Sequence, residues 1–191
     1  MIAAPAEKYI SAEEFMLVAN SVEYADRRVE LVDGVIVEMG KPGWKHGNIV
    51  AEFTALLRNH VKPNGLGKVN SGDTAHVLGK KLDGRDTVRG IDIAFVAAAR
   101  IPADLPDGSV PFAPDLAVEV ISPGNEAEDI HEKVLELLNA GCRLVLVLYP
   151  NTETIVAHTQ HGARTYFPDD TLDFGDVLPG FTLAVRAVFD V

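Results

Sequence analysis

Residues 114–150 constrain the fold more than any other part of the chain. Two apolar runs, residues 115–121 and 143–149, flank a segment whose apolar residues recur at helical spacing. This order predicts a βαβ unit, because strand-length apolar runs on both sides of a helical pattern are typical of one. The first run carries Glu119 between valines, and the helix carries Lys133 on its apolar stripe. A charge in a core is costly unless it is paired, hydrogen-bonded or bound to a metal, so this pair is the leading indication of function.

The remaining patterns predict an α+β chain with a mixed sheet and few helices. A capping box at residues 11–14 predicts a short helix, and Asp33-Gly34 between two apolar runs predicts a hairpin over residues 28–39. Apolar residues at helical spacing over 46–61 predict a second helix. Further strands are predicted over residues 68–78 (interrupted at 71–73), 88–96, 154–158, 165–167 and 182–188, with polar segments over 80–85 and 169–173. We expect one domain over residues 1–191, a length that can bury a core.

The negative net charge of the chain disfavours binding to nucleic acid. Seventeen basic residues stand against 28 acidic ones, a formal net charge of −11, with no block of Lys or Arg. Proteins that bind nucleic acid normally carry a basic stripe, because affinity comes largely from neutralising phosphates. A single cysteine, Cys142, fits a reducing compartment, and no apolar run is long enough to span a membrane. We therefore expect a cytoplasmic protein with no membrane partner.

Two acids lie inside strand patterns. Side chains alternate between the faces of a strand, and Asp92 in the 88–96 run shares its face with small or apolar residues, as does Glu119 in its own run. Two carboxylates that converge from neighbouring strands would form a site for a hard divalent cation. The alternative is that each acid lies at a strand end in solvent, where acids are usually found.

Other charged residues are candidates for the same site. Lys133 flanks the stripe of its helix, from which its ammonium would reach the carboxylates; the alternative is a boundary lysine whose head extends to water. Glu30, on the first arm of the hairpin, is a candidate third carboxylate, and Glu52 in the second helix is its rival. His46 follows a Gly-rich loop at the start of that helix, and is a candidate for function or for a capping or loop role.

The order of these parts resembles the Uma-two family, which comprises restriction-endonuclease-like proteins of the PD-(D/E)xK nuclease superfamily. An acid in a hairpin is followed by an aspartate in a strand, a glutamate in the run Pro-Asp-Leu-Ala-Val-Glu-Val-Ile-Ser-Pro, and a lysine eleven residues after that serine. Further matches are residues 9–15, 29–34 and 178–181, together with His46, so the resemblance spans most of the chain. It implies a restriction-endonuclease-like fold, with a mixed central sheet flanked by helices and added hairpins.

The resemblance also implies a role for each site residue. Asp92 and Glu119 would hold Mg²⁺ or Mn²⁺, Glu30 would be the accessory acid, and Lys133 the catalytic lysine. In the superfamily that lysine normally stands two residues after the strand acid, where this chain has Ile121, so the helix would supply it here. The implied activity is a metal-dependent endonuclease that hydrolyses phosphodiester bonds of DNA.

Two other functions stay open at this point. The acidic surface and the displaced lysine favour a catalytically inactive, nuclease-like scaffold that binds a protein partner or regulates a neighbour. A hydrolase of small phosphoesters would also tolerate an acidic surface better than a DNA enzyme does. A homodimer would suit a nuclease that cuts both strands, and the apolar segments 110–113 and 184–191 are candidate contacts for it.

Overall fold

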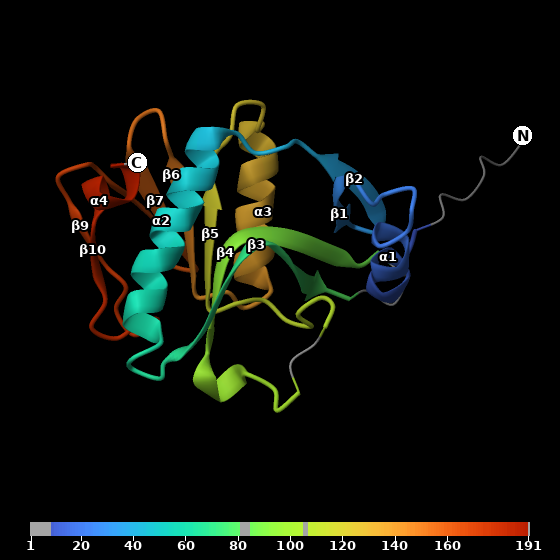
Figure 1. The fold of residues 1–191 in the computed structure, drawn as a ribbon, viewed down its shortest axis with the longest axis horizontal. Coiled ribbons are helices and arrows are strands. Elements are labelled where there is room, and N and C mark those ends of the chain that lie inside the picture. The colour runs from blue at the N-terminus through green and yellow to red at the C-terminus, as the bar shows by residue number, and fades with distance from the viewer. Residues whose placement is uncertain (1–8, 81–84, 105–106, 191) are drawn as a thin grey trace, which may run out of the picture.

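The centre of the molecule is built from three strands, β4 (Thr87–Ala97), β5 (Leu116–Val120) and β6 (Leu144–Tyr149) (Figure 1). The structure, a computed structural model, describes residues 9–80, 85–104 and 107–190. Strands β5 and β6 are parallel and are joined by helix α3 (Ala127–Asn139), so the predicted βαβ unit is confirmed. Every residue of β5 is buried, as expected for a strand covered on both faces.

The predicted N-terminal elements are also confirmed. Strands β1 (Arg28–Val32) and β2 (Val35–Met39) form the hairpin, and both turn residues, Asp33 and Gly34, have positive φ values of 47° and 78°. A two-residue turn of this kind favours Asp-Gly. Helix α1 (Ala12–Ala19) begins with the predicted capping box, in which Ser11 and Glu14 exchange hydrogen bonds. Of the predicted polar turn over residues 80–85, residues 81–84 lie outside the described part of the chain.

Within the described residues the strands form an eight-stranded mixed sheet in the order β2-β1-β4-β5-β6-β7-β8, with β3 paired to β4 alone. Only the pairing of β5 with β6 is parallel among these strand pairs. The strands not yet given are β3 (Gly67–Gly79), β7 (Thr154–Thr159) and β8 (Gly162–Tyr166). The β7–β8 hairpin and the interruption of β3, a register shift between Ser71 and Thr74, agree with the sequence patterns.

Helices cover both faces of the sheet. Helix α2 (Trp44–Val61) packs its Phe53 and Leu57 on the face formed by Leu116, Val118 and Leu146, whereas Leu137 of α3 packs on Ala117 and Val145 of the opposite face. Figure 1 shows these helices on either side of the central strands. The predicted fold class, a mixed sheet flanked by helices with added hairpins, is confirmed. In the described ranges, no helix is both long and apolar enough to cross a membrane.

The C-terminal segment differs from its predicted strand over residues 182–188. Strand β10 (Thr182–Ala184) pairs with β9 (Thr171–Asp173), which lies in a segment predicted only as polar, and the chain then forms helix α4 (Val185–Phe189). The apolar residues of α4 recur at i, i+3 and i+4, so they fit a helix as well as a strand. Val188 is buried against the α2 side of the core, and Ala113 is buried on the other side. Of the two apolar segments considered as dimer contacts, Ala113, Val185, Val188 and Phe189 are therefore used in internal packing.

One feature of β4 positions the candidate site. Strand β3 pairs along one edge of β4, whereas two different strands share the other edge. Strand β1 pairs with β4 at Val88, and β5 pairs with it from Ile93 onward. Residues 89–92 lie between these two pairings, so in the described part of the chain their backbone groups on this edge face no neighbouring strand.

Candidate active site

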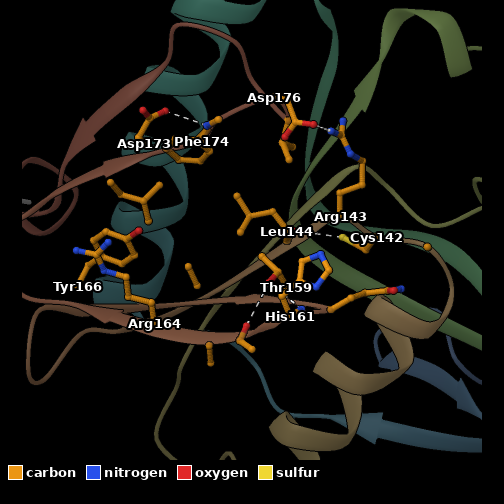
Figure 2. Close-up of a pocket in the computed structure, with 18 residues that line it drawn as sticks. Cys142, Arg143, Leu144, Thr159, His161, Arg164, Tyr166, Asp173, Phe174 and Asp176 are labelled. Atoms are coloured by element: carbon orange, nitrogen blue, oxygen red, sulfur yellow. Dashed lines mark hydrogen bonds and ion pairs between the residues drawn. The ribbon is translucent and has the colours of Figure 1, made fainter.

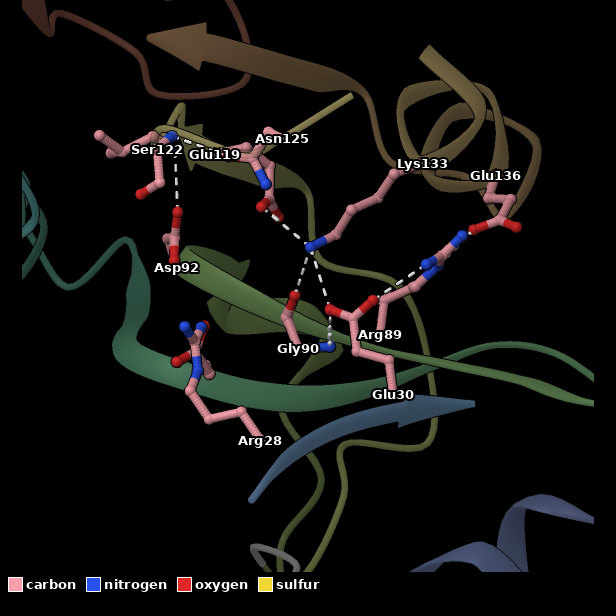
Figure 3. Close-up of polar contacts among 12 residues, drawn as sticks. Arg28, Glu30, Arg89, Gly90, Asp92, Glu119, Ser122, Asn125, Lys133 and Glu136 are labelled. Atoms are coloured by element: carbon pink, nitrogen blue, oxygen red, sulfur yellow. Dashed lines mark hydrogen bonds and ion pairs between the residues drawn. The ribbon is translucent and has the colours of Figure 1, made fainter. Parts of the chain in front are cut away.

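On the edge of β4 where residues 89–92 pair with no described strand, side chains form the hydrogen bonds to the backbone instead. The N–H of Gly90 donates to Oε1 of Glu30 at 3.1 Å, and the carbonyl of Gly90 accepts from Nζ of Lys133 at 2.7 Å (Figure 3). Glu30 comes from β1 and Lys133 from α3, so three elements meet at this point. Buried backbone polar groups cost free energy if they stay unpaired, and charged side chains here satisfy both groups of Gly90.

Lys133 is the centre of this network. Its Nζ donates to Oε2 of Glu119 at 2.9 Å and to Oε1 of Glu30 at 3.2 Å, besides the carbonyl of Gly90. The residue is only 7% exposed, which excludes the alternative of a boundary lysine with its head in water. Burial alone lowers the pKa of Lys133, but the carboxylates of Glu119 and Glu30 outweigh burial and raise it. The ammonium is therefore charged at neutral pH and held in one place by three acceptors.

Glu30 lies in the site with both of its oxygens occupied. Oε2 accepts from Nη1 of Arg89 at 2.9 Å, while Oε1 accepts from Gly90 and Lys133. Arg89 also donates from Nε to Glu136 of α3 at 2.6 Å, one turn beyond Lys133. Glu30 is thus placed to hold Arg89 and Lys133 rather than to offer a free oxygen to a metal. Its rival Glu52 does not line the cavity at this site.

Asp92 is held by groups from two other elements. Its Oδ2 accepts from the N–H of Val120 at 2.8 Å, and its Oδ1 lies 3.2 Å from Nε2 of His46. Burial raises the pKa of Asp92, but the hydrogen bonds from His46 and Val120 outweigh burial and lower it. Nδ1 of His46 is 3.0 Å from the hydroxyl of Ser122, and the hydrogen bond to Asp92 raises the pKa of His46. Since Gly43 occupies the N-cap of α2, His46 is an Asp92 partner and not a cap.

Glu119 has one oxygen that the described residues leave without a partner. Oε2 accepts from Lys133, whereas Oε1 is buried and has no hydrogen-bond donor. Burial, assisted by the nearby charge of Asp92, raises the pKa of Glu119 to about 8 in spite of the opposing effect of Lys133. A buried oxygen of this kind is costly, and a bound cation would satisfy it. This orphaned oxygen, next to Asp92, fits a divalent metal.

The raised pKa of Glu119 predicts how stability depends on pH when no metal is bound. The folded value of about 8 exceeds the ordinary 4.5, so the folded state binds a proton that the unfolded state releases. This contribution is fully present below pH 4.5 and is lost as the pH rises to about 8. In EDTA, we expect thermal denaturation midpoints to fall by several degrees more over this window for wild type than for Glu119→Gln. Parallel curves for the two proteins would contradict the assignment.

The carboxylates line a cavity of about 290 Å³. Six acidic residues and four basic residues line this cavity, together with His46. The acidic residues are Glu30, Glu38, Asp73, Asp92, Glu119 and Asp129, and the basic residues are Arg28, Lys41, Arg89 and Lys133. This excess of acids favours a cation. Within the described residues, no three His, Cys, Asp or Glu side chains form a complete metal site. Mg²⁺ needs no such cage, because it usually binds through one or two carboxylates and keeps waters or takes substrate phosphates.

Asp73 is a site residue that the sequence did not single out. It lies at the interruption of β3, where its φ of 56° is unusual for a residue other than glycine. Its carboxylate pairs with Arg28 and faces Asp92. Burial and Asp92 raise the pKa of Asp73 against the effect of Arg28. The only sequence signal was the Ser-Gly-Asp triplet inside a strand pattern, which indicates a bulge but not the direction of the side chain.

A larger cavity, of about 650 Å³, lies between strands β6–β8 and residues 172–177 (Figure 2). Arg143 and Asp176 form an ion pair at 2.7 Å in its lining. Burial raises the pKa of the Cys142 thiol to about 12, so the thiol is protonated at neutral pH and is a poor nucleophile. Since the paired carboxylates and the buried lysine line the smaller cavity instead, we assign the chemistry there.

Comparison with known proteins agrees with the fold. The model of the Uma2 family, described as "Putative restriction endonuclease", matches residues 12–186. The chain belongs to the Uma2 family. A crystal structure of "a putative nuclease belonging to DUF820 from Anabaena variabilis ATCC 29413" is similar to this Uma2 protein, with a TM-score of 0.81 and 21% sequence identity over 94% of this chain and 97% of that chain. That likeness shows a common fold, and the family and fold expected from the sequence are confirmed. No curated protein gives a significant match.

Proposed function

We propose that this chain is a divalent-metal-dependent endonuclease that hydrolyses phosphodiester bonds of DNA. The observation that carries the proposal is the unpartnered, buried Oε1 of Glu119, which lies beside Asp92 and next to a charged lysine. Two carboxylates in one cavity would hold a divalent metal that assists phosphoryl hydrolysis, and a lysine beside them would stabilise the charge that develops. Membership of the Uma2 family supports the same reaction class.

Each site residue has a distinct task in the proposed reaction. Asp92 and Glu119 would hold Mg²⁺ or Mn²⁺, which when bound polarises the scissile phosphate and lowers the pKa of a water. Lys133 would stabilise the negative charge that develops on the phosphate oxygens and orient the attacking water. His46 fixes the carboxylate of Asp92, while Glu30 and the Gly90 carbonyl fix the ammonium of Lys133. The reacting groups are therefore preorganised by neighbours that need not touch the substrate.

The acidic charge of the chain limits how it can bind DNA. A net charge of −11 does not support a long track of phosphate contacts. We propose that the protein engages a short stretch of DNA around the cavity, where a bound metal supplies the local positive charge. Binding should therefore weaken when the metal is removed.

The test is cleavage of supercoiled plasmid and of single-stranded DNA at low salt, with Mg²⁺, with Mn²⁺ and with EDTA. We expect cleavage with either metal and none in EDTA, and we expect Glu52→Gln, a matched change outside the cavity, to cleave like wild type. Titration calorimetry with both metals accompanies the assay. A protein that neither cleaves DNA nor binds either ion would contradict the proposal and favour the inactive, partner-binding scaffold.

A further inference from the structure

A second cavity lies beside the candidate active site and carries an exposed aromatic side chain. This Trp44 cavity, of about 370 Å³, is lined by the first turn of α2, the segment after β5 and the turn after β6. Trp44 is the first residue of α2 and the only tryptophan of the chain, and it is 86% exposed. Tyr149, at the end of β6, and Pro123 line the same cavity. The lining thus combines two aromatic rings with an apolar floor.

The Trp44 cavity adjoins the cavity that holds the carboxylates. His46, Ser122 and Pro123 line both. The two cavities adjoin because the parallel strands β5 and β6 end at the same edge of the sheet, beside the start of α2 (Figure 1). Ligands in sheets with parallel strands commonly bind at the carboxyl ends of those strands. A molecule whose phosphate reaches Asp92 and Glu119 would therefore have its next group beside Trp44.

The walls of the Trp44 cavity are held in place. Nζ of Lys45 donates to the carbonyl of Pro150 at 2.7 Å, which ties the first turn of α2 to the turn after β6. The hydrogen bond between His46 and Ser122 ties the same turn of α2 to the segment after β5. These hydrogen bonds hold the backbone segments that carry Trp44 and Tyr149 in fixed positions. Binding to such a surface costs little conformational entropy of the protein.

We propose that the Trp44 cavity is a base-stacking subsite, which takes one unpaired nucleobase of a DNA strand whose phosphate lies at Asp92 and Glu119. The inference rests on the proposed nuclease function and narrows the substrate to single-stranded or locally unpaired DNA, because a base in duplex is covered by its neighbours. Stacking on an aromatic ring tolerates any base, since every base has a π-face. Stacking also supplies affinity that does not depend on neutralising phosphates, which suits a chain with a net charge of −11.

The only tryptophan makes the subsite directly observable, without cleavage. With Ca²⁺ in place of Mg²⁺, we expect a short oligothymidylate to quench Trp44 fluorescence, and an abasic strand of equal length to leave it unchanged. By anisotropy of a labelled oligothymidylate, Trp44→Ala should bind about tenfold more weakly, whereas Trp44→Phe should recover most of the affinity. Phe167→Ala is the matched control, because Phe167 is an exposed aromatic residue outside the Trp44 cavity.

The outcomes separate this inference from the nuclease function. Quenching by oligothymidylate without any cleavage would support the subsite and contradict the nuclease. Metal-dependent cleavage with no quenching, and with equal binding of base-containing and abasic strands, would overturn the subsite and leave the nuclease intact. A blue shift of Trp44 emission on raising the protein concentration without DNA would also overturn it, because a second copy of the chain would then cover the ring.

Discussion

Replacing Glu119 by glutamine should reduce metal-dependent DNA cleavage by about 10³-fold or more, since loss of one transition-state donor already costs about 10²–10³. The amide removes the charge that a metal requires on the unpartnered Oε1. The variant should still fold, because the glutamine carbonyl can accept the hydrogen bond from Lys133 and the amide is uncharged, like the protonated acid that the raised pKa favours at neutral pH. The defect should therefore be in metal binding and catalysis, and not in stability.

Three measurements on Glu119→Gln test this expectation. Titration calorimetry should show weakened binding of Mg²⁺ and Mn²⁺, initial cleavage rates should fall with it, and thermal denaturation should show a folded chain. Glu52→Gln removes a glutamate from α2 that does not line the cavity, and it should match wild type in all three. A Glu119→Gln protein that cleaves as fast as wild type would show that the cavity is not the active site.

Local sequence patterns were enough to predict the elements that carry the site. The Asp-Gly turn and the βαβ unit depend on residues close together in the chain, so hydrophobic periodicity and turn chemistry identify them. Glu119 and Lys133 stood out for a related reason, because a charge within an apolar pattern contradicts its surroundings. Residues 185–188 were predicted wrongly as strand, because their apolar spacing fits a strand and a helix alike.

The rest of the site depends on contacts that no local pattern encodes. Arg89 joins Glu30 to Glu136, and these two carboxylates come from elements far apart in the chain. The two carboxylates come close together beside the stretch of β4 that lies between its pairing with β1 and its pairing with β5. The position of that stretch is known only from the strand register. Asp73 reaches the cavity because β3 shifts register there. A single sequence does not show where neighbouring strands begin to pair, so these partners could not be predicted.

Replacing Lys133 by methionine should reduce cleavage by about 10²–10³-fold while Mg²⁺ binding is retained, in contrast to Glu119→Gln. Lys133 competes with a metal for Glu119 and gives no ligand atom, so its loss removes charge stabilisation from the reaction without removing the carboxylates. Lys62→Met, at the exposed C-cap of α2, is the matched control and should cleave like wild type. Loss of metal binding in parallel with cleavage would reassign Lys133 to a structural role.

The stability of Lys133→Met distinguishes a catalytic loss from a folding loss. Removing the ammonium leaves Glu30 and Glu119 without a shared cation, and breaking a buried ion pair typically costs about 3–5 kcal/mol. At a pH above the raised pKa of Glu119, adding Glu119→Gln to this variant removes one unpaired charge, so thermal denaturation in EDTA at that pH should show the double variant to be more stable than Lys133→Met alone. Mg²⁺ should stabilise Lys133→Met but not the double variant, because a ligand stabilises only the protein that binds it. Equal stabilisation of both variants by Mg²⁺ would mean that the metal binds somewhere other than Glu119.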